Sequence, residues 1–203
     1  EAEARTAGRV RERWEEIKAA DVAGIVGCWA DIDIDDPVHK KSGLPPDESA
    51  ALAVAKSTGL EPSILIHSGH GLQAWWLLNE PWSFETPEDR RKAATLVRAW
   101  DLSLRDRTKR LGWTLDAVGD LSRLLRIPGT RNCKALPVAV RIEQNNAVRY
   151  SVDDLEAVLI EGTWQQAERE LRNEPTSDRP ADDGDLVLNP AAEPPKDRMF
   201  ALC

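Results

Sequence analysis

Apolar and polar residues alternate with two different periodicities along this chain, and these predict both helices and strands. Helical spacing of apolar residues, an Ala-rich stretch and helix-start signals together predict five helices. They cover residues 5–20, 47–57, 87–110, 152–160 and 163–173. Thr86 and Pro87 mark the start of the long third helix, and Val97, Trp100 and Leu104 would form its inner face.

Short apolar runs predict five strands, over residues 25–35, 63–67, 72–78, 121–127 and 138–143. The second and third would form a hairpin around Ser68-Gly69-His70-Gly71, and Asn79-Glu80-Pro81 would end the third. This order of elements indicates an α+β or mixed α/β domain over residues 1–173. Residues 174–203 are rich in Pro and Asp, which is typical of a linker, here toward a further C-terminal part.

The composition is that of a globular protein, with 41% hydrophobic and 31% charged residues among 203. No apolar run approaches the roughly 20 residues that a membrane-spanning helix needs. Cys28, Cys133 and Cys203 are scattered, which argues against a disulfide framework and predicts a reducing, cytoplasmic location. The absence of a CxxC pair disfavours a structural zinc site. The chain begins without Met, and we expect a preceding segment.

The charges are unevenly distributed along the chain. The net charge of -8 alone disfavours nucleic-acid binding, yet residues 90–141 hold 13 Lys and Arg against 4 Asp and Glu. Because the local field steers a polyanion, an acidic protein can still hold a basic groove. A solvated basic face on the helix over 87–110 explains the charges of that helix equally well.

Three carboxylates alternate along the first predicted strand, at Asp31, Asp33 and Asp35. Alternate residues of a strand share a face, so the intervening isoleucines would face the core and the aspartates a cleft. Neighbouring carboxylates repel each other unless a cation lies between them. Mg²⁺ prefers such oxygen ligands, and two-metal phosphoryl transfer uses a carboxylate pair. A solvent-facing acidic edge strand is the alternative.

The predicted hairpin brings polar side chains and glycines together. Its two turn glycines let the backbone approach a ligand closely, and Ser68, His70 and Gln73 supply polar groups nearby. A Gly-rich turn with incidental polar residues is the alternative. Trp75 and Trp76 follow; we expect one in the core, and stacking of the other on a base is a minor possibility.

Cations gather around a second turn, at Pro128-Gly129. Arg126 lies in or beside the strand predicted over 121–127, where a buried cation needs a partner. Arg131, Asn132 and Lys134 follow the turn. Arginine suits bidentate recognition of phosphate, and lysine acts as a point charge.

Two aspartates precede this turn. Asp116 or Asp120 would supply a third metal carboxylate, or would pair with Arg126 inside the fold. The two arrangements are compatible, because an enzyme can use such an ion pair to order its site.

These motifs, in this order, resemble the bifunctional primase-polymerase domains of the archaeo-eukaryotic primase superfamily, of the kind found in phages, plasmids and integrated elements of actinobacteria. The resemblance covers about residues 22–150 and rests on Trp29 to Asp33, Ser68 to Trp76, and Asp116 with Leu124 to Lys134. It implies an RRM-like catalytic core with a smaller α/β subdomain. It also implies a nucleotidyltransferase, a DNA primase or DNA polymerase of replication that adds nucleotides to a 3′-hydroxyl by two-metal-ion catalysis.

The resemblance implies roles for individual residues. Asp31, Asp33 and Asp116 would bind Mg²⁺ or Mn²⁺, with Asp120 as the runner-up for the third position and Asp35 less suited. His70 would be catalytic by contacting the triphosphate, and Gln73 stands where many relatives carry a histidine, so either side chain would fill that position. The remaining nucleotide-binding residues would be Ser68, Arg126, Asn132 and Lys134.

The implied partners are a single-stranded DNA template, a primer strand and NTP or dNTP, with a helicase or helical priming domain C-terminal to residue 203 and no membrane. A rolling-circle nuclease is disfavoured because His67 and His70 have the wrong spacing for its metal pair and Tyr150 is the only tyrosine. A non-catalytic replication initiator or nucleic-acid-binding module with the same fold stays open, since Gln73 replaces the strand histidine.

Overall fold

The computed structural model describes residues 19–37, 39 and 41–173. Apart from residues 19 and 20, the helix predicted over 5–20 lies outside the described residues, as does the linker predicted over 174–203. The elements, in chain order, are η1 (Ala19–Asp21), β1 (Gly24–Asp33), α2 (Glu48–Lys56), β2 (Ile64–His67), β3 (Gly71–Ser83), α3 (Pro87–Arg110), β4 (Arg131–Asn132), β5 (Val138–Ala139), β6 (Arg141–Asn145), α4 (Val152–Ala157) and α5 (Thr163–Asn173). No helix among the described residues has the length and apolar character to cross a membrane.

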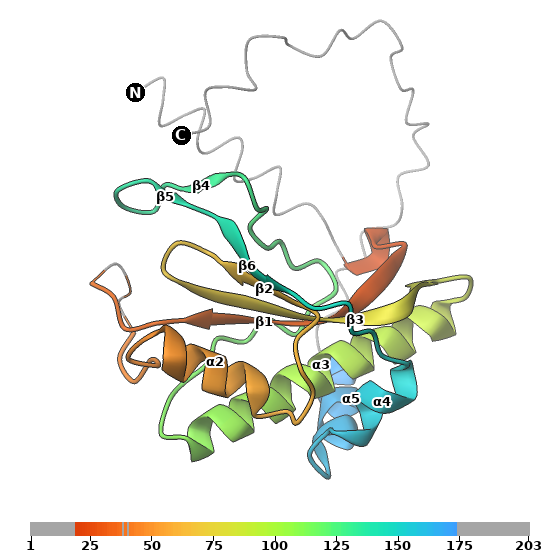
Figure 1. The fold of residues 1–203 in the computed structure, drawn as a ribbon. Helices are drawn as coiled ribbons and strands as arrows, with labels where there is room; N and C mark the ends of the chain where they lie inside the picture. Colours follow the sequence, from red (N-terminus) through yellow and green to blue (C-terminus); the bar gives the residue numbers. More distant parts are fainter. Residues whose placement is uncertain (1–18, 38, 40, 174–203) are drawn as a thin grey trace, which may run out of the picture.

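Four strands form one antiparallel sheet in the order β1-β3-β2-β6. The helices α2 and α3 lie against one face of this sheet, and α5 packs on α3 (Figure 1). The two-stranded β4–β5 hairpin lies on the other side (Figure 1). The mixture of helices with an antiparallel sheet agrees with the α+β class expected from the sequence.

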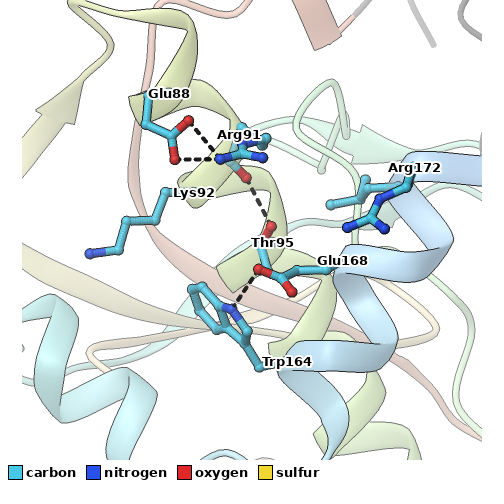
Figure 2. Close-up of a pocket in the computed structure, with 8 residues that line it drawn as sticks. Glu88, Arg91, Lys92, Thr95, Trp164, Glu168 and Arg172 are labelled. Carbon is cyan, nitrogen blue, oxygen red and sulfur yellow. Dashed lines mark hydrogen bonds and ion pairs between the residues drawn. The ribbon is translucent and has the colours of Figure 1, made fainter.

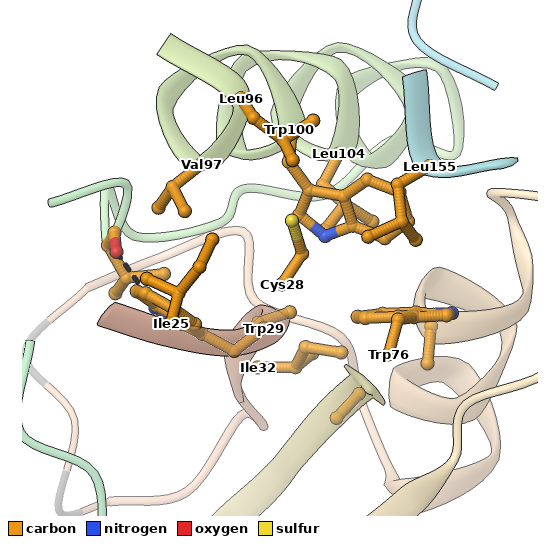
Figure 3. Packing of buried hydrophobic residues seen from close by; sticks show 14 of the residues in the cluster. Ile25, Cys28, Trp29, Ile32, Trp76, Leu96, Val97, Trp100, Leu104 and Leu155 are labelled. Carbon is orange, nitrogen blue, oxygen red and sulfur yellow. Dashed lines mark hydrogen bonds between the residues drawn. The ribbon is translucent and has the colours of Figure 1, made fainter. Parts of the chain in front are cut away.

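The core lies between the sheet and α3. Cys28, Ala30 and Ile32 of β1 are fully buried on the helix-facing side. Trp76 of β3 packs edge-to-face against Trp100 of α3, with ring centroids 4.9 Å apart (Figure 3). Aromatic pairs of this geometry add stability beyond the area they bury. The predictions that one tryptophan of the hairpin is in the core, and that α3 turns Trp100 inward, are confirmed.

Local signals in the sequence start the helices where they were predicted. The side chain of Asp47 accepts a hydrogen bond from the backbone N–H of Ala50 at the start of α2. Thr86 and Asp89 form a reciprocal capping box on α3, and Ser151 with Asp154 form one on α4. Each box satisfies backbone N–H groups that the first helical turn leaves without partners.

The strand predicted over residues 121–127 is wrong, because these residues form a turn and irregular chain. The apolar pattern misleads here: Leu124 and Ile127 are exposed, and this segment pairs with no strand among the described residues. Pro81 likewise fails to end β3. Ile25 of β1 pairs with Trp82 of β3 and Gly27 pairs with Leu77, so the ladder leaves out the residues of β3 around Pro81. The N–H that proline lacks is therefore not needed for pairing with β1.

Gly71 allows a close approach of two backbones beside the acidic strand. A Cβ atom at Gly71 would lie 2.3 Å from the carbonyl oxygen of Ile32. We expect Gly71→Ala to lower the free energy of unfolding in urea by about 2–3 kcal/mol, because neither backbone can move aside. Gly59→Ala is the control, because a Cβ atom at Gly59 would meet open space. Its only cost is the strain of an alanine at a φ of +83°, about 1 kcal/mol. A smaller loss in Gly71→Ala than in Gly59→Ala would contradict the steric argument.

Candidate active site

The site face of the sheet, opposite α2 and α3, carries Asp31 and Asp33 near the end of β1. Asp31 pairs across the strands with Gln73, and Asp33 pairs with Gly71. Both carboxylates are partly buried. Asp35 lies beyond the strand and is exposed, with its backbone N–H bound to the carbonyl of Pro45. The strand therefore presents Asp31 and Asp33 to the same side. The sequence predicted Asp35 beside them, but β1 already ends at Asp33.

Burial and mutual repulsion perturb this pair. Burial raises the pKa of Asp31, the charge of Asp33 raises it further, and Arg126 partly offsets both effects. Burial also raises the pKa of Asp33, against the opposing influence of His39 and Lys134. The two charges are therefore incompletely compensated by the protein, which is the situation that a divalent cation would relieve.

Asp116 approaches the same pair from the irregular chain that follows α3. Its charge raises the pKa of both Asp31 and Asp33. The segment is held by long-range hydrogen bonds: Asp101 accepts from the N–H of Val118 at 2.9 Å, and Trp29 Nε1 donates to the carbonyl of Val118 at 3.0 Å. Asp120, the alternative third carboxylate, instead pairs with Arg123 at 2.6 Å. The structure thus brings Asp116 to the acidic pair.

A histidine and a lysine of the loop after β1 contact these carboxylates. His39 Nδ1 lies 3.2 Å from Asp33, and Lys41 pairs with Asp116. Among the described residues, no group of three or more His, Cys, Asp or Glu side chains is already arranged to hold a metal ion. The donor set nevertheless fits a hard divalent cation, because it consists of carboxylate oxygens, and burial raises the pKa of two of these groups, Asp31 and Asp33.

Asn132 joins the hairpin turn at residues 68–71 to the β4–β5 hairpin. Its Nδ2 donates to the carbonyl of Ser68 at 2.8 Å, and its Oδ1 accepts from the N–H of Lys134 at 3.1 Å. A Cβ atom on Gly69 would lie 2.9 Å from the side chain of Asn132, so the turn and the amide fit tightly. Asn132 is buried and places Ser68 and Lys134 beside each other. Its predicted contact with a nucleotide stays a prediction.

The two histidines of the hairpin have different surroundings. His67 Nε2 lies 3.1 Å from Glu48, and its Nδ1 accepts from the N–H of Gly69, so both nitrogens have partners. His70 Nδ1 lies 3.3 Å from Asp36. His70 Nε2 is buried and has no hydrogen-bond partner among the described residues. Of the two, His70 therefore keeps a ring nitrogen for a ligand.

Gln73 lies in the interior of the site face. It is fully buried, its Nε2 is 3.5 Å from Asp31 Oδ1, and its Oε1 has no hydrogen-bond partner among the described residues. The amide therefore faces the metal-ligand candidate Asp31. Trp75, on the same face, packs against Trp29 with ring centroids 5.8 Å apart. Stacking of Trp75 on a base stays a prediction.

Sequence reasoning missed His39, Lys41 and Asp36. All three follow the strand predicted over 25–35, in a segment to which the sequence analysis assigned no site residue. The one available signal was their chemistry: a histidine and a lysine follow the aspartates closely in the chain. Lys134 Nζ also lies 3.2 Å from His39 Nδ1, so this loop connects the acidic pair to the cations after β4.

A cavity of about 410 Å³ lies elsewhere, between the start of α3 and α5 (Figure 2). Its polar side chains largely satisfy each other: Arg91 binds Glu88 through both carboxylate oxygens, and Trp164 Nε1 donates to Glu168 (Figure 2). It contains none of the residues of the acidic site. We therefore place the candidate active site on the exposed face of the sheet and not in this cavity.

Comparison with known proteins supports the fold. No protein-family model matches the chain, and no curated protein matches it in sequence. Among solved structures, the chain is similar to the AEP domain of the cyanophage S-2L primase-polymerase (PrimPol), with a TM-score of 0.51 and 16% sequence identity. The match covers 70% of this chain and 64% of the other, so this chain spans slightly less than two thirds of that domain. At this identity the likeness shows that the two share a fold, here a mixed α/β domain with an antiparallel sheet.

Proposed function

We propose that this domain catalyses template-directed nucleotidyl transfer, as a DNA primase or DNA polymerase acting in replication of a phage, plasmid or integrated element. The observation that carries the proposal is that Asp31 and Asp33 share one face of β1, where the charge of Asp116 acts on both of them and the cations Arg126 and Lys134 lower the pKa of Asp33. The structural likeness to a primase-polymerase domain supports it. An RRM-like catalytic core with a smaller α/β subdomain is part of the same proposal.

The three carboxylates would hold Mg²⁺ or Mn²⁺. Such a metal pair would lower the pKa of the attacking 3′-hydroxyl and stabilise the leaving pyrophosphate. Among this chain's own residues, Arg126 and Lys134 place positive charge beside the acidic pair, where the triphosphate would bind. His70 contributes a ring nitrogen that is still without a partner among the described residues. Asn132 positions the turn and the Lys134 backbone relative to each other.

Two other functions were considered from the sequence. A rolling-circle nuclease needs an accessible tyrosine nucleophile, but Tyr150 is buried and its hydroxyl donates to the carbonyl of Glu61 at 2.6 Å. A non-catalytic initiator with the same fold would not need three carboxylates in one place. Burial raises the pKa of both Asp31 and Asp33, and the charge of Asp33 raises the pKa of Asp31 further. A bound cation would relieve both effects, which supports the enzyme.

The test is nucleotide incorporation on a primed single-stranded template with Mg²⁺ or Mn²⁺. We expect extension by the wild type and none by Asp31→Ala/Asp33→Ala, while single-strand affinity stays equal or rises because negative charge is lost. Asp35→Ala is the matched control, because Asp35 is an exposed carboxylate just beyond β1. Extension by the double variant, or none by a correctly folded wild type, would refute the proposal for this domain.

A further inference from the structure

A basic arm projects from the site side of the sheet. The basic arm, residues 123–142, contains five Lys and Arg and no Asp or Glu. It begins as irregular chain and continues as the β4–β5 hairpin. Two more backbone hydrogen bonds, which join Val140 to Gly129 and to Thr130, continue the pairing beyond β4 and β5. In Figure 1 the hairpin stands away from α2 and α3. The hairpin of the arm is therefore not part of the helix-packed core.

Large apolar side chains are exposed along this arm. Six large hydrophobic side chains are exposed among the described residues, and four of them belong to the arm. The exposed fractions are 56% for Leu124, 68% for Ile127, 85% for Leu136 and 52% for Ile142. Isolated exposed apolar residues need no explanation, but four on one charged segment mark a surface for interaction.

The arm keeps a positive charge after its local ion pairs are counted. Arg123 pairs with Asp120, and Arg141 pairs with Glu143 at 2.6 Å. After these two ion pairs, the charges of Arg126, Arg131 and Lys134 are not neutralised by the flanking carboxylates. Arg126 and Lys134 act on the acidic pair of β1, whereas Arg131 is exposed on β4. The outer part of the arm thus combines a cation with apolar groups.

The arm is anchored at the active site. Asn132 binds the turn at Ser68, and Lys134 contacts His39, which contacts Asp33. A partner that lies along the arm is therefore led to the carboxylates of β1. The partner must offer negative charge to the cations and apolar surface to the leucines and isoleucines.

We propose that the basic arm binds a single-stranded nucleic acid, with Arg131 on a phosphate and Leu136 against an unstacked base. The proposal rests on the proposed function and names the surface on which that function's nucleic-acid strand is held. A single strand has both features, since its phosphates are anionic and its base faces are accessible. A duplex hides the base faces, so the exposed apolar groups would gain nothing from it.

The test measures affinity for a fluorescently labelled 20-nucleotide single strand and for a blunt duplex of equal length, by anisotropy across a salt series. We expect Arg131→Ser/Leu136→Ser to bind the single strand roughly tenfold more weakly, with the salt slope reduced by about 0.7 for the lost phosphate contact. Arg110→Ser/Leu111→Ser is the matched control, since it removes an exposed cation and an exposed leucine at the far end of α3. An equal loss in this control, or an equal loss on the duplex, would overturn the proposal.

Cys133 gives a local readout on the arm. It is exposed, whereas Cys28 is buried and reports unfolding if it reacts. We expect bound single strand to slow alkylation of Cys133, followed by mass spectrometry; unchanged alkylation at saturating single strand would contradict the arm contact.

Primer extension on the same samples separates the two proposals. If the wild type extends primers, and Arg131→Ser/Leu136→Ser binds the single strand as tightly as the wild type, the arm proposal alone is refuted. Weakened binding in that variant, with no extension by the wild type, refutes the polymerase alone.

Discussion

Asp31→Asn is expected to abolish metal-dependent nucleotide incorporation and, at the same time, to stabilise the metal-free protein at neutral pH. The first effect follows from loss of an anionic metal ligand, for which we expect at least a roughly 1,000-fold lower rate. The second follows because burial and the charge of Asp33 disfavour the ionised Asp31 carboxylate. Asn keeps the size of the side chain and an oxygen for Gln73 Nε2. The two effects therefore have opposite signs in one variant.

The stability difference between Asp31→Asn and the wild type should depend on pH in a defined direction. The pKa of Asp31 is raised in the folded state, so the folded protein binds more protons than the unfolded chain just above the ordinary carboxyl pKa of about 4. Wild-type stability therefore falls as the pH rises from there through the raised pKa. Asp31→Asn lacks this loss, so its advantage should appear near neutral pH and disappear as the pH approaches 4.

Urea unfolding in EDTA, at several pH values between 4 and 8, measures this difference. Adding Mn²⁺ should then stabilise the wild type, because a ligand that binds only the folded state shifts the equilibrium. The gain should be much smaller in Asp31→Asn. A metal-free variant that is less stable than the wild type at pH 7 would show that the protein itself compensates the charge of Asp31, and would remove the physical argument for a cation there.

The sequence predicted those parts of the fold that depend on neighbouring residues. The caps at Thr86 and Ser151 are each complete within four residues, and the alternation in β1 places Asp31 and Asp33 on one face whatever the rest of the chain does. The segment over 121–127 shows the limit of such reasoning. Its apolar residues match a strand, but a strand needs a partner to pair with, and the sequence pattern does not say whether one is in reach.

The same limit separates the predicted from the missed residues of the site. Contacts of His39 with the acidic pair and with Lys134 join residues up to 95 positions apart, and no local pattern encodes them. Asn132 was predicted as a ligand contact, but it donates to Ser68, 64 positions earlier, and so first acts as a link between two turns. The resemblance preferred Asp116 to Asp120 as the third carboxylate. Long-range bonds of Asp101 and Trp29 to Val118 hold this segment, in which the charge of Asp116 acts on the acidic pair and Asp120 pairs with Arg123.

Gln73→Met is expected to weaken Mn²⁺ binding roughly tenfold while leaving the metal-free protein as stable as the wild type or more so. The Gln73 side chain is fully buried, with its Nε2 toward Asp31 and its Oε1 without a partner among the described residues. A buried carbonyl without a hydrogen bond costs about 1–3 kcal/mol, so an apolar side chain of similar length should be tolerated or favoured. The loss should fall on the metal, because Asp31 would no longer be oriented by the amide.

Isothermal titration with Mn²⁺ and urea unfolding in EDTA together decide the role of Gln73. Gln144→Met is the matched control, because Gln144 is also a strand glutamine, on β6, but donates to Asn146 just beyond that strand, away from the carboxylates. A purely structural role would lower the stability of Gln73→Met and leave its Mn²⁺ affinity at the wild-type value. Unchanged Mn²⁺ affinity would mean that Gln73 does not orient a metal ligand. Gln73 would then be a candidate, beside His70, for the contact with the nucleotide that the sequence predicted. A tenfold loss would instead leave that contact to His70, whose Nε2 is buried without a partner among the described residues.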